Sequence, residues 1–214
     1  VQAAGAGMEE YKPGDRVLAP GVHGSHWLTY PLVDLPGSPS NAKSPIQRIE
    51  YDITDEQAAF SVLGDVALHG VRRAELQIDE SVAVFGQGVV GQLTTALCRM
   101  SGAYPVIAVD LDADRLAVAK QSGATHTVDA SRENAVEAVQ TITDGGAQSV
   151  IHASGSSKTL VDCMKAAADR GKVVVVGFPH DTVETGLRDE LLDKELQVRG
   201  SNELWGLGSP PPYW

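Results

Sequence analysis

Short runs rich in valine and isoleucine recur along the chain after residue 80, and they constrain the fold more than any other feature. They lie at 80–85, 105–110, 125–129, 149–154, 172–178 and 195–200. Helical patterns separate them, at about 89–101, 113–122, 132–141, 157–169 and 187–193. Near-continuous apolar strands that alternate with helices are typical of a parallel sheet covered on both faces. We therefore expect an α/β fold built on a doubly wound parallel sheet.

A glycine-rich turn joins the first of these strands to its helix. Gly86, Gly88 and Gly91 form the pattern G-x-G-x-x-G in the stretch VAVFGQGVVGQ. Between a strand and a helix, this pattern is the dinucleotide-binding fingerprint of the Rossmann fold: the first glycine permits a tight turn, the second a close approach of pyrophosphate, and the third close helix packing. The N–H groups at the helix start would then bind the phosphates. The alternative is a glycine-rich turn without a ligand.

An acidic residue ends the second strand. Asp110 follows Gly91 by 19 residues, near the place where the fingerprint has a carboxylate that binds the ribose hydroxyls. A carboxylate there also repels a 2′-phosphate, and no arginine directly follows it, so we expect NAD rather than NADP. Arg115 lies one helical turn further on, where it either covers the ribose or phosphate or is only a solvated charge.

Charge and composition exclude several classes of partner. The net charge of −11 argues against nucleic acid and anionic membranes, which bind clustered Lys and Arg. No run approaches the ~18 apolar residues of a membrane span, and the first residues do not resemble a secretory signal. Cys98 and Cys163 lie in apolar helical patterns, where we expect buried free thiols. This cysteine usage fits a reducing, cytoplasmic setting.

The first fifty residues differ from the rest of the chain in composition. They are rich in Gly and Pro, with a short strand expected first, then a turn at Lys12–Asp15, a second strand at Arg16–Ala19 and a long irregular loop at 31–45. From Thr54 a helix is expected to run to about Arg73, because Thr54 and Gln57 have the spacing of a capping box.

Several segments together resemble the medium-chain dehydrogenase/reductase superfamily, which includes the zinc-type alcohol and polyol dehydrogenases. They are GDRV, TDEQAAF, ALHGVRRA, VAVFGQGVVGQ, DLDADRLAVAKQSGA, GKVVVVG and KELQVRGS. The resemblance covers roughly residues 1–205 and implies a partial member. It implies a remnant of a GroES-like β domain at 1–50, a connecting helix at 51–75, a Rossmann dinucleotide-binding domain at 76–201 and a tail at 202–214.

The resemblance also implies a cofactor site. Its residues fall into three groups: Gly86, Gly88, Val89, Val90 and Gly91 at the pyrophosphate; Asp110 and Arg115 at the adenosine ribose; and Ser154, Gly155, Val176, Gly177 and Phe178 beside the nicotinamide. The KELQVRGS strand is similar to one that pairs between subunits in many members. A homodimer or higher homo-oligomer is therefore expected.

The chain departs from the zinc members of the superfamily at the metal ligands. Their early Cys and Gly-His-Glu motif precede the stretch that matches Val1–Val17, and a further ligand would fall near Val62 or Leu63, which cannot bind a metal. We therefore expect no zinc site. His23 and His26 are either a metal pair without an evident third ligand or part of a surface or cleft-lining loop. His152 is expected to face the cofactor cleft or the core.

Two functions remain open. The first is an NAD-dependent oxidoreductase that transfers a hydride between the nicotinamide and a small alcohol, polyol or carbonyl compound. The proton would then pass through a side chain or water, with Asp65 and His26 as candidate catalytic residues. A capping or ion-paired role is the alternative for Asp65, which interrupts an apolar helix face. The second function is a non-catalytic dinucleotide-binding module, or a fragment of a longer dehydrogenase.

Overall fold

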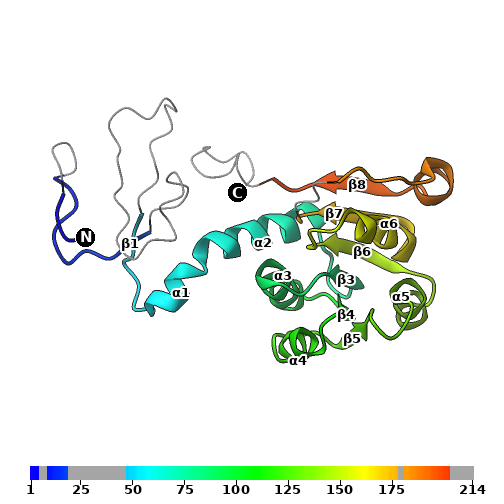
Figure 1. The fold of residues 1–214 in the computed structure, drawn as a ribbon, viewed down its shortest axis with the longest axis horizontal. Coiled ribbons are helices and arrows are strands. Elements are labelled where there is room, and N and C mark those ends of the chain that lie inside the picture. The colour runs from blue at the N-terminus through cyan, green and yellow to red at the C-terminus, as the bar shows by residue number, and fades with distance from the viewer. Residues whose placement is uncertain (5–8, 19–46, 178–180, 203–214) are drawn as a thin grey trace. The chain divides into compact units, whose positions relative to one another are not determined.

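A computed structural model describes residues 1–4, 9–18, 47–177 and 181–202 of the chain. Two compact units are present (Figure 1). The first comprises Val1–Val62 together with Leu204–Trp214, and the second comprises Leu63–Glu203. None of the helices in the described ranges is long and apolar enough to cross a membrane.

The first unit contains a short antiparallel ladder. Strand β1 (Val17–Leu18) pairs with β2 (Gln47–Arg48), whereas the strand expected before the turn is absent from the described residues 1–4 and 9–12. The expected turn is present, because the Asp15 N–H donates to the Lys12 carbonyl at 3.0 Å and the Lys12 N–H donates to the Asp15 carboxylate at 2.8 Å. The GroES-like remnant stays a prediction, since a ladder of this size does not identify a domain. The loop expected at 31–45 lies outside the described residues.

The helix expected from Thr54 begins there but is interrupted once. Thr54 Oγ1 accepts a hydrogen bond from the Gln57 N–H at 3.2 Å, and Gln57 Oε1 accepts one from the Thr54 N–H at 2.9 Å, so the capping box is confirmed. Helix α1 (Asp55–Ala59) ends at Phe60, and α2 (Ser61–Ala74) follows. The Ser61 hydroxyl donates to the Ala58 carbonyl at 2.6 Å. Such a side-chain bond competes with the helical ladder, which accounts for the break.

The second unit is built on a parallel sheet of six strands in the order β5-β4-β3-β6-β7-β8 (Figure 1). The strands are β3 (Val82–Phe85), β4 (Val106–Asp110), β5 (His126–Asp129), β6 (Ala147–His152), β7 (Ala167–Val175) and β8 (Gln197–Gly200). The order reverses between β3 and β6, where the chain crosses from one half of the sheet to the other. The doubly wound fold expected from the sequence is confirmed.

Helices cover both faces of this sheet. On one face lie α2, α3 (Val89–Met100) and α4 (Ala113–Gln121), and on the other lie α5 (Ala135–Thr143) and α6 (Ser157–Ala166). Strand β4 shows the alternation. Val106 packs in the cluster of α2 and α3, whereas Ile107 packs with Val139 of α5 and Met164 of α6. Burial on both faces explains why β3 and nearly all of β4 are apolar without alternation, whereas the outer strands β5 and β8 are mostly exposed and more polar.

Three expected helix bounds differ from those observed. The helix expected to reach residue 169 ends at Ala166, because Ala167 already pairs with Ala147 as the first residue of β7. The helix expected from residue 132 begins at Ala135, because the Asn134 side chain accepts the N–H bonds of the first turn. The segment expected at 187–193 forms a π-helical turn, η2 (Leu187–Leu192).

A buried ion pair joins the amino ends of three strands. Glu80 precedes β3 and is 5% exposed. Its carboxylate lies 2.7 Å from Lys172 Nζ of β7 and accepts a hydrogen bond of 2.5 Å from the Ser149 hydroxyl of β6. Burial alone would raise the pKa of Glu80, but the bonds from Lys172, Ser149 and the Gln77 N–H together lower it. The pair therefore links β3, β6 and β7 at the edge of the sheet opposite the glycine turn.

Candidate functional site

A hollow of about 650 Å³ opens at the carboxyl edge of the sheet. Segments that follow β3, β4, β5 and β6 line it, together with residues of α5 and α6. In open α/β sheets, ligands bind at this edge, where the strand order reverses. The lining residues are Phe85, Gly86, Gly88, Val109, Asp110, Leu111, Arg115, Ala130, Glu133, Asn134, Ala135, Val136, Ala153, Ser154, Gly155, Ser156, Thr159 and Asp162.

The glycine turn lies at one wall of this hollow and requires glycine at two positions. Gly86 has a φ of 94°, and its N–H donates to the Val109 carbonyl at 2.8 Å. A Cβ on Gly91 would lie 1.8 Å from the Gly86 carbonyl oxygen. The two glycines therefore bring α3 directly against the end of β3, as the fingerprint requires.

Gly88 has a different part in the turn. It is the N-cap residue of α3, and it provides no side chain to cap the first N–H groups of that helix. A Cβ built on Gly88 would meet nothing within 4 Å. The backbone at the positive end of the α3 dipole is thus accessible from the hollow, which is the arrangement that binds anions.

The carboxylate of Asp110 is held in a fixed orientation at the rim of the hollow. Oδ2 accepts a hydrogen bond of 2.5 Å from the Gln87 N–H, and Oδ1 accepts one of 3.0 Å from the Asp112 N–H. A carboxylate offers about four acceptor positions, so Asp110 can still accept hydroxyl donors. Arg115 also lines the hollow, and its side chain is 56% exposed and 3.7 Å from the Asp112 carboxylate.

His152 lies in the core and not in the hollow. It is fully buried at the end of β6, and Nε2 is 3.0 Å from the Ser156 carbonyl oxygen. Burial lowers the pKa of His152, although the bond to Ser156 opposes this effect. The neutral ring therefore donates its Nε2–H to Ser156. Of the two positions expected for this histidine, the core is the one observed, and from there it fixes the loop that follows β6.

The residues expected at a cofactor divide into three sets. Those that line the hollow are Gly86, Gly88, Asp110, Arg115, Ser154 and Gly155. Those that do not line it are Val89, Val90, Gly91, Val176 and Gly177. Phe178, His23 and His26 lie outside the described residues. Asp65 lies half-buried on α2 and does not line the hollow.

Several lining residues were not expected from the sequence. Leu111 directly follows β4 and is 69% exposed, and Ala130 directly follows β5. The carboxyl ends of parallel strands share one edge, so the residue after each strand is a candidate for this site. That signal was present in the sequence. Thr159 and Asp162 lie inside α6 and carried no such signal.

The described residues do not fit a zinc ion. No group of three or more His, Cys, Asp or Glu side chains with the arrangement of a metal site occurs among them. Burial raises the pKa of Cys98 to about 12, and burial also raises the pKa of Cys163. A buried neutral thiol is a poor zinc ligand, because zinc binds the thiolate.

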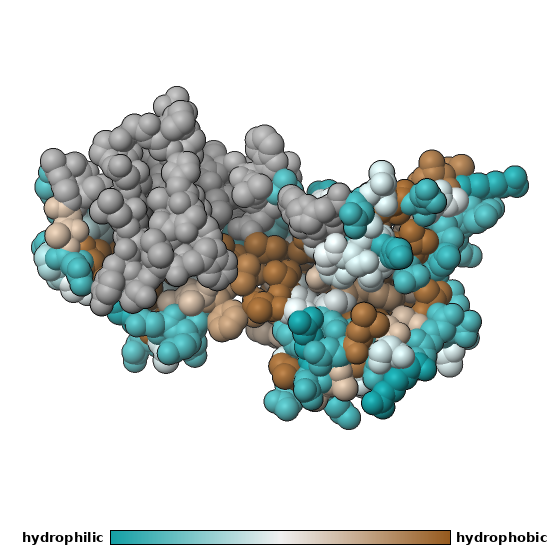
Figure 2. Space-filling view, in the orientation of Figure 1, coloured by the Kyte–Doolittle hydropathy of each residue, from teal (hydrophilic) through white to brown (hydrophobic). Residues whose placement is uncertain are grey.

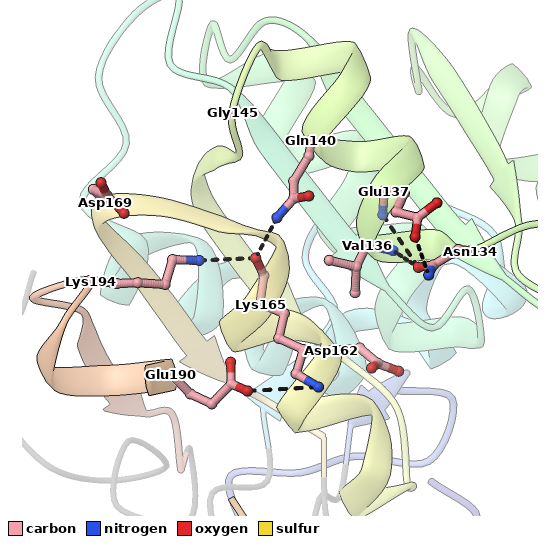
Figure 3. Close-up of a pocket in the computed structure, with 10 residues that line it drawn as sticks. All are labelled: Asn134, Val136, Glu137, Gln140, Gly145, Asp162, Lys165, Asp169, Glu190 and Lys194. Carbon is pink, nitrogen blue, oxygen red and sulfur yellow. Dashed lines mark hydrogen bonds and ion pairs between the residues drawn. The ribbon is translucent and has the colours of Figure 1, made fainter. Parts of the chain in front are cut away.

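A second hollow, of about 570 Å³, lies between α5, α6 and η2 (Figure 3). Several of its polar groups bind one another: Lys165 is 3.7 Å from Glu190, and Lys194 and Gln140 both donate to the Lys165 carbonyl. Lys194 also donates to the carbonyls of Met164 and Ala167. These contacts cap the end of α6, so the polar groups that make them have a structural role. The hollow at the glycine turn is the candidate functional site.

The doubly wound sheet with this glycine turn defines a Rossmann-type domain. Residues 89–204, more than half of the chain, match the family described as zinc-binding dehydrogenase. The chain therefore belongs to the zinc-binding dehydrogenase family.

The chain spans only part of the length of the curated relatives described next. It is 29% identical over 221 residues to sorbitol dehydrogenase of Bacillus subtilis, covering 94% of this chain and 62% of that protein. It is 32% identical over 135 residues to L-threonine 3-dehydrogenase of Bacillus velezensis, covering 63% of this chain and 39% of that protein. The chain thus spans about three fifths of the sorbitol dehydrogenase, and less of the other.

Solved structures agree with the fold. Benzyl alcohol dehydrogenase from Acinetobacter calcoaceticus aligns with a TM-score of 0.68 at 29% identity, covering 78% of this chain and 47% of that one. A zinc-binding dehydrogenase-type protein from Sinorhizobium meliloti 1021, solved with bound NADP, aligns with a TM-score of 0.67 at 31% identity. That alignment covers 73% of this chain and 47% of that one.

Proposed function

We propose that this chain is the cofactor-binding part of an NAD(H)-dependent oxidoreductase of the alcohol and polyol dehydrogenase type. One observation carries the proposal: the Asp110 carboxylate is oriented by the Gln87 N–H at the rim of the hollow that Gly86 and Gly88 line. A diphosphate and a ribose attached to it need these two groups at adjacent strand ends. Sorbitol and threonine, named for two of the relatives, bear hydroxyl groups, which supports a small alcohol or polyol as the substrate class.

The lining residues suggest how a dinucleotide would bind. The diphosphate would lie against the N–H groups at the start of α3, where Gly88 leaves the backbone accessible. The Asp110 carboxylate would accept the ribose hydroxyls. Ser154 and Gly155 would border the nicotinamide side. When bound, the nicotinamide supplies the hydride chemistry, and the residues of this chain bind and orient it.

Charge at the ribose end favours NAD over NADP. Asp110 and Asp112 are both carboxylates, and the Asp112 side chain already accepts hydrogen bonds from the Asp114 and Arg115 N–H groups. A 2′-phosphate placed beside Asp110 would be repelled, and among the described residues that line the hollow Arg115 is the cationic side chain that could bind it. The similar protein from Sinorhizobium meliloti was solved with bound NADP. The affinities of this chain for NADH and NADPH therefore have to be compared directly.

We propose that the proton passes to or from the substrate through a side chain of the protein or through water. Asp65 and His26 remain our candidates, and no step is routed through zinc because the described residues do not fit it. Asp65→Asn tests the first candidate. We expect this variant to bind NADH normally and to lose substrate turnover if Asp65 carries the proton.

Titration calorimetry of the purified chain with NADH and NADPH tests the proposed function. We expect NADH to bind more tightly than NADPH, and no heat with either at millimolar ligand would overturn the proposal. An assay of NADH formation with a panel of alcohols and polyols, on protein whose intact mass matches 22.6 kDa, then tests catalysis. NADH binding without turnover of any alcohol would favour the alternative, a binding module or a fragment of a longer dehydrogenase.

A second copy of this chain is the macromolecular partner that we propose. Strand β8 is the last in the order of the sheet, and Leu187, Leu192 and Val198 are 61%, 66% and 44% exposed. Figure 2 shows apolar surface in the region of η2, among mostly hydrophilic surroundings. Pairing of two β8 strands would cover this edge. Sedimentation at micromolar concentration should give at least a dimer, and a monomer would contradict this proposal.

The setting that we propose is cytoplasmic. Cys98 and Cys163 are both buried and unpaired, as is common in reducing compartments. The net charge of −11 makes nucleic acid and anionic membranes unfavourable partners. Fractionation of the producing cells, with detection of the chain in each fraction, tests this setting.

A further inference from the structure

Gln87 occupies the first variable position of the glycine turn, and its side chain is buried. The residue is 1% exposed. Its Nε2 donates a hydrogen bond of 3.1 Å to the Val84 carbonyl, and its Oε1 accepts one of 3.1 Å from the Thr95 hydroxyl. Val84 belongs to β3 and Thr95 to the middle of α3. The amide therefore connects the strand and the helix on either side of the turn.

The backbone of the same residue is bonded on both sides. Its N–H donates to Asp110 Oδ2 at 2.5 Å. Its carbonyl accepts a bond of 3.3 Å from Gln92 Nε2, which also donates to the Arg115 carbonyl at 2.8 Å. The position of the Gln87 backbone thus affects the Asp110 carboxylate and the first turn of α4.

A buried amide is an unusual choice for a turn. Transferring an amide from water to an apolar interior is unfavourable unless each of its groups is hydrogen-bonded. An apolar side chain of similar length would fill the same space without that requirement. The two bonds of the Gln87 amide have specific directions, so they fix the peptide of Gln87 in a way that apolar packing does not.

We propose that Gln87 is a positioning residue for the dinucleotide site. Its buried amide holds the glycine turn, and through the Gln87 N–H it holds the Asp110 carboxylate, in the binding orientation before any ligand arrives. Gln87 does not line the hollow, so its side chain acts through Asp110 and the turn without touching the cofactor. This inference rests on the proposed function, since the ligand is the dinucleotide.

The first test uses Gln87→Met, which keeps the length of the side chain and removes both amide bonds. Gln140→Met is the matched control, because Gln140 also donates to a carbonyl, that of Lys165, at the other hollow. We expect NADH to bind about tenfold more weakly to Gln87→Met and unchanged to the control. Thr95→Val removes one of the two bonds with little change of shape, and it should weaken binding in the same direction.

A double-mutant cycle with Asp110→Ala separates positioning from general destabilisation. Because Gln87 acts partly through Asp110 and partly through the turn, the loss caused by Gln87→Met should be clearly smaller than tenfold, but not absent, once Asp110 is already alanine, since coupled residues are not additive. A full tenfold loss in both backgrounds would overturn the proposal. So would unchanged NADH affinity in Gln87→Met.

Hydrogen exchange on the ligand-free chain gives a readout independent of any cofactor. The amides of residues 87–92 should exchange faster in Gln87→Met, while those of β6 should not change. If the unmodified chain binds neither NADH nor NADPH, the proposed function fails, and exchange alone then decides whether Gln87 fixes the turn. Equal exchange at 87–92 in both proteins would overturn the inference.

Discussion

The backbone N–H of Gln87 lies 2.5 Å from Oδ2 of Asp110. The turn after β3 and the last residue of β4 are therefore linked directly, although 23 residues separate them along the chain. In the parallel register Phe85 lies beside Val109, so the segments that follow them emerge together at the carboxyl edge. This link orients an acidic side chain beside an accessible helix N-terminus.

Replacement of Asp110 should weaken NADH binding and change the choice of cofactor. Asp110→Ala removes an acceptor for ribose hydroxyls, and bonds to charged groups contribute about 1.5–3 kcal/mol, so we expect roughly a tenfold to hundredfold loss. NADPH should lose less, because the repulsion of its 2′-phosphate is also removed. Titration calorimetry measures both. Asp129→Ala is the control, since Asp129 ends β5 but does not line the hollow. Equal affinities of Asp110→Ala and the unmodified chain for NADH would show that Asp110 does not bind the ribose.

The glycines of the turn should respond differently to an added methyl group. In Gly91→Ala the new Cβ would lie 1.8 Å from the Gly86 carbonyl oxygen, so the backbone must move and stability should fall by about 1–3 kcal/mol or more. In Gly88→Ala the Cβ meets nothing within 4 Å, so stability should change little while NADH binding weakens. Urea unfolding and calorimetry on both variants separate the effects. Tight NADH binding by Gly88→Ala would show that no phosphate lies against that position.

The ion pair of Glu80 and Lys172 should contribute stability that acid removes. The pKa of Glu80 is lowered from 4.5 in the folded chain, so its contribution is complete above about 4.5 and is lost as the pH falls through the lower folded value. Glu80→Gln leaves Lys172 without its carboxylate and should cost about 3–5 kcal/mol at pH 7. Urea unfolding of both proteins at pH 7, 5 and 3 should show this difference shrink toward acid. A constant difference across that range would contradict the assignment.

Both cysteine thiols should be unreactive in the folded chain. Cys98 and Cys163 are fully buried, and burial raises the pKa of Cys98 to about 12. Since the thiolate is the reactive form, a disulfide reagent should modify neither cysteine at pH 8 until urea unfolds the protein. Rapid modification of a native thiol would show that the helices on one face of the sheet open readily.

The purified chain should contain much less than one zinc ion per molecule. The described residues provide no suitable group of ligands. Elemental analysis after dialysis without chelator checks this. A near-stoichiometric zinc content would point first to His23 and His26, and His26→Ala would then be expected to release the metal.

The sequence predicted the class of fold and part of the candidate site because both depend on local patterns. Apolar runs without alternation predicted parallel strands, and the sheet confirms them, with β3 and β4 buried and the outer strands β5 and β8 mostly exposed. The capping box of Thr54 and Gln57 was also predicted from the sequence, since all its atoms lie within four consecutive residues. Gly86, Gly88 and Asp110 were placed at one site by a spacing rule, and all three line the hollow.

The rest depended on contacts between segments that are distant along the chain. Alanine favours a helix, but Ala167 pairs with Ala147 and is therefore the first residue of β7. Nothing near Gln87 in the sequence indicates that its amide is buried between β3 and α3. Likewise, Asp162 reaches the hollow only because α6 packs beside α5 on one face of the sheet.

The amino-acid sequence by itself therefore determined the order of strands and helices, though not all their bounds, and which turn can approach a diphosphate, because backbone preferences and apolar periodicity act over a few residues. The tertiary structure decided which side chains meet, because the order of strands in the sheet sets the distance between residues that the chain keeps far apart. The hydrogen bond from Gln87 to Asp110 depends on both, because the local sequence forms the glycine turn and the order of strands places β4 beside it.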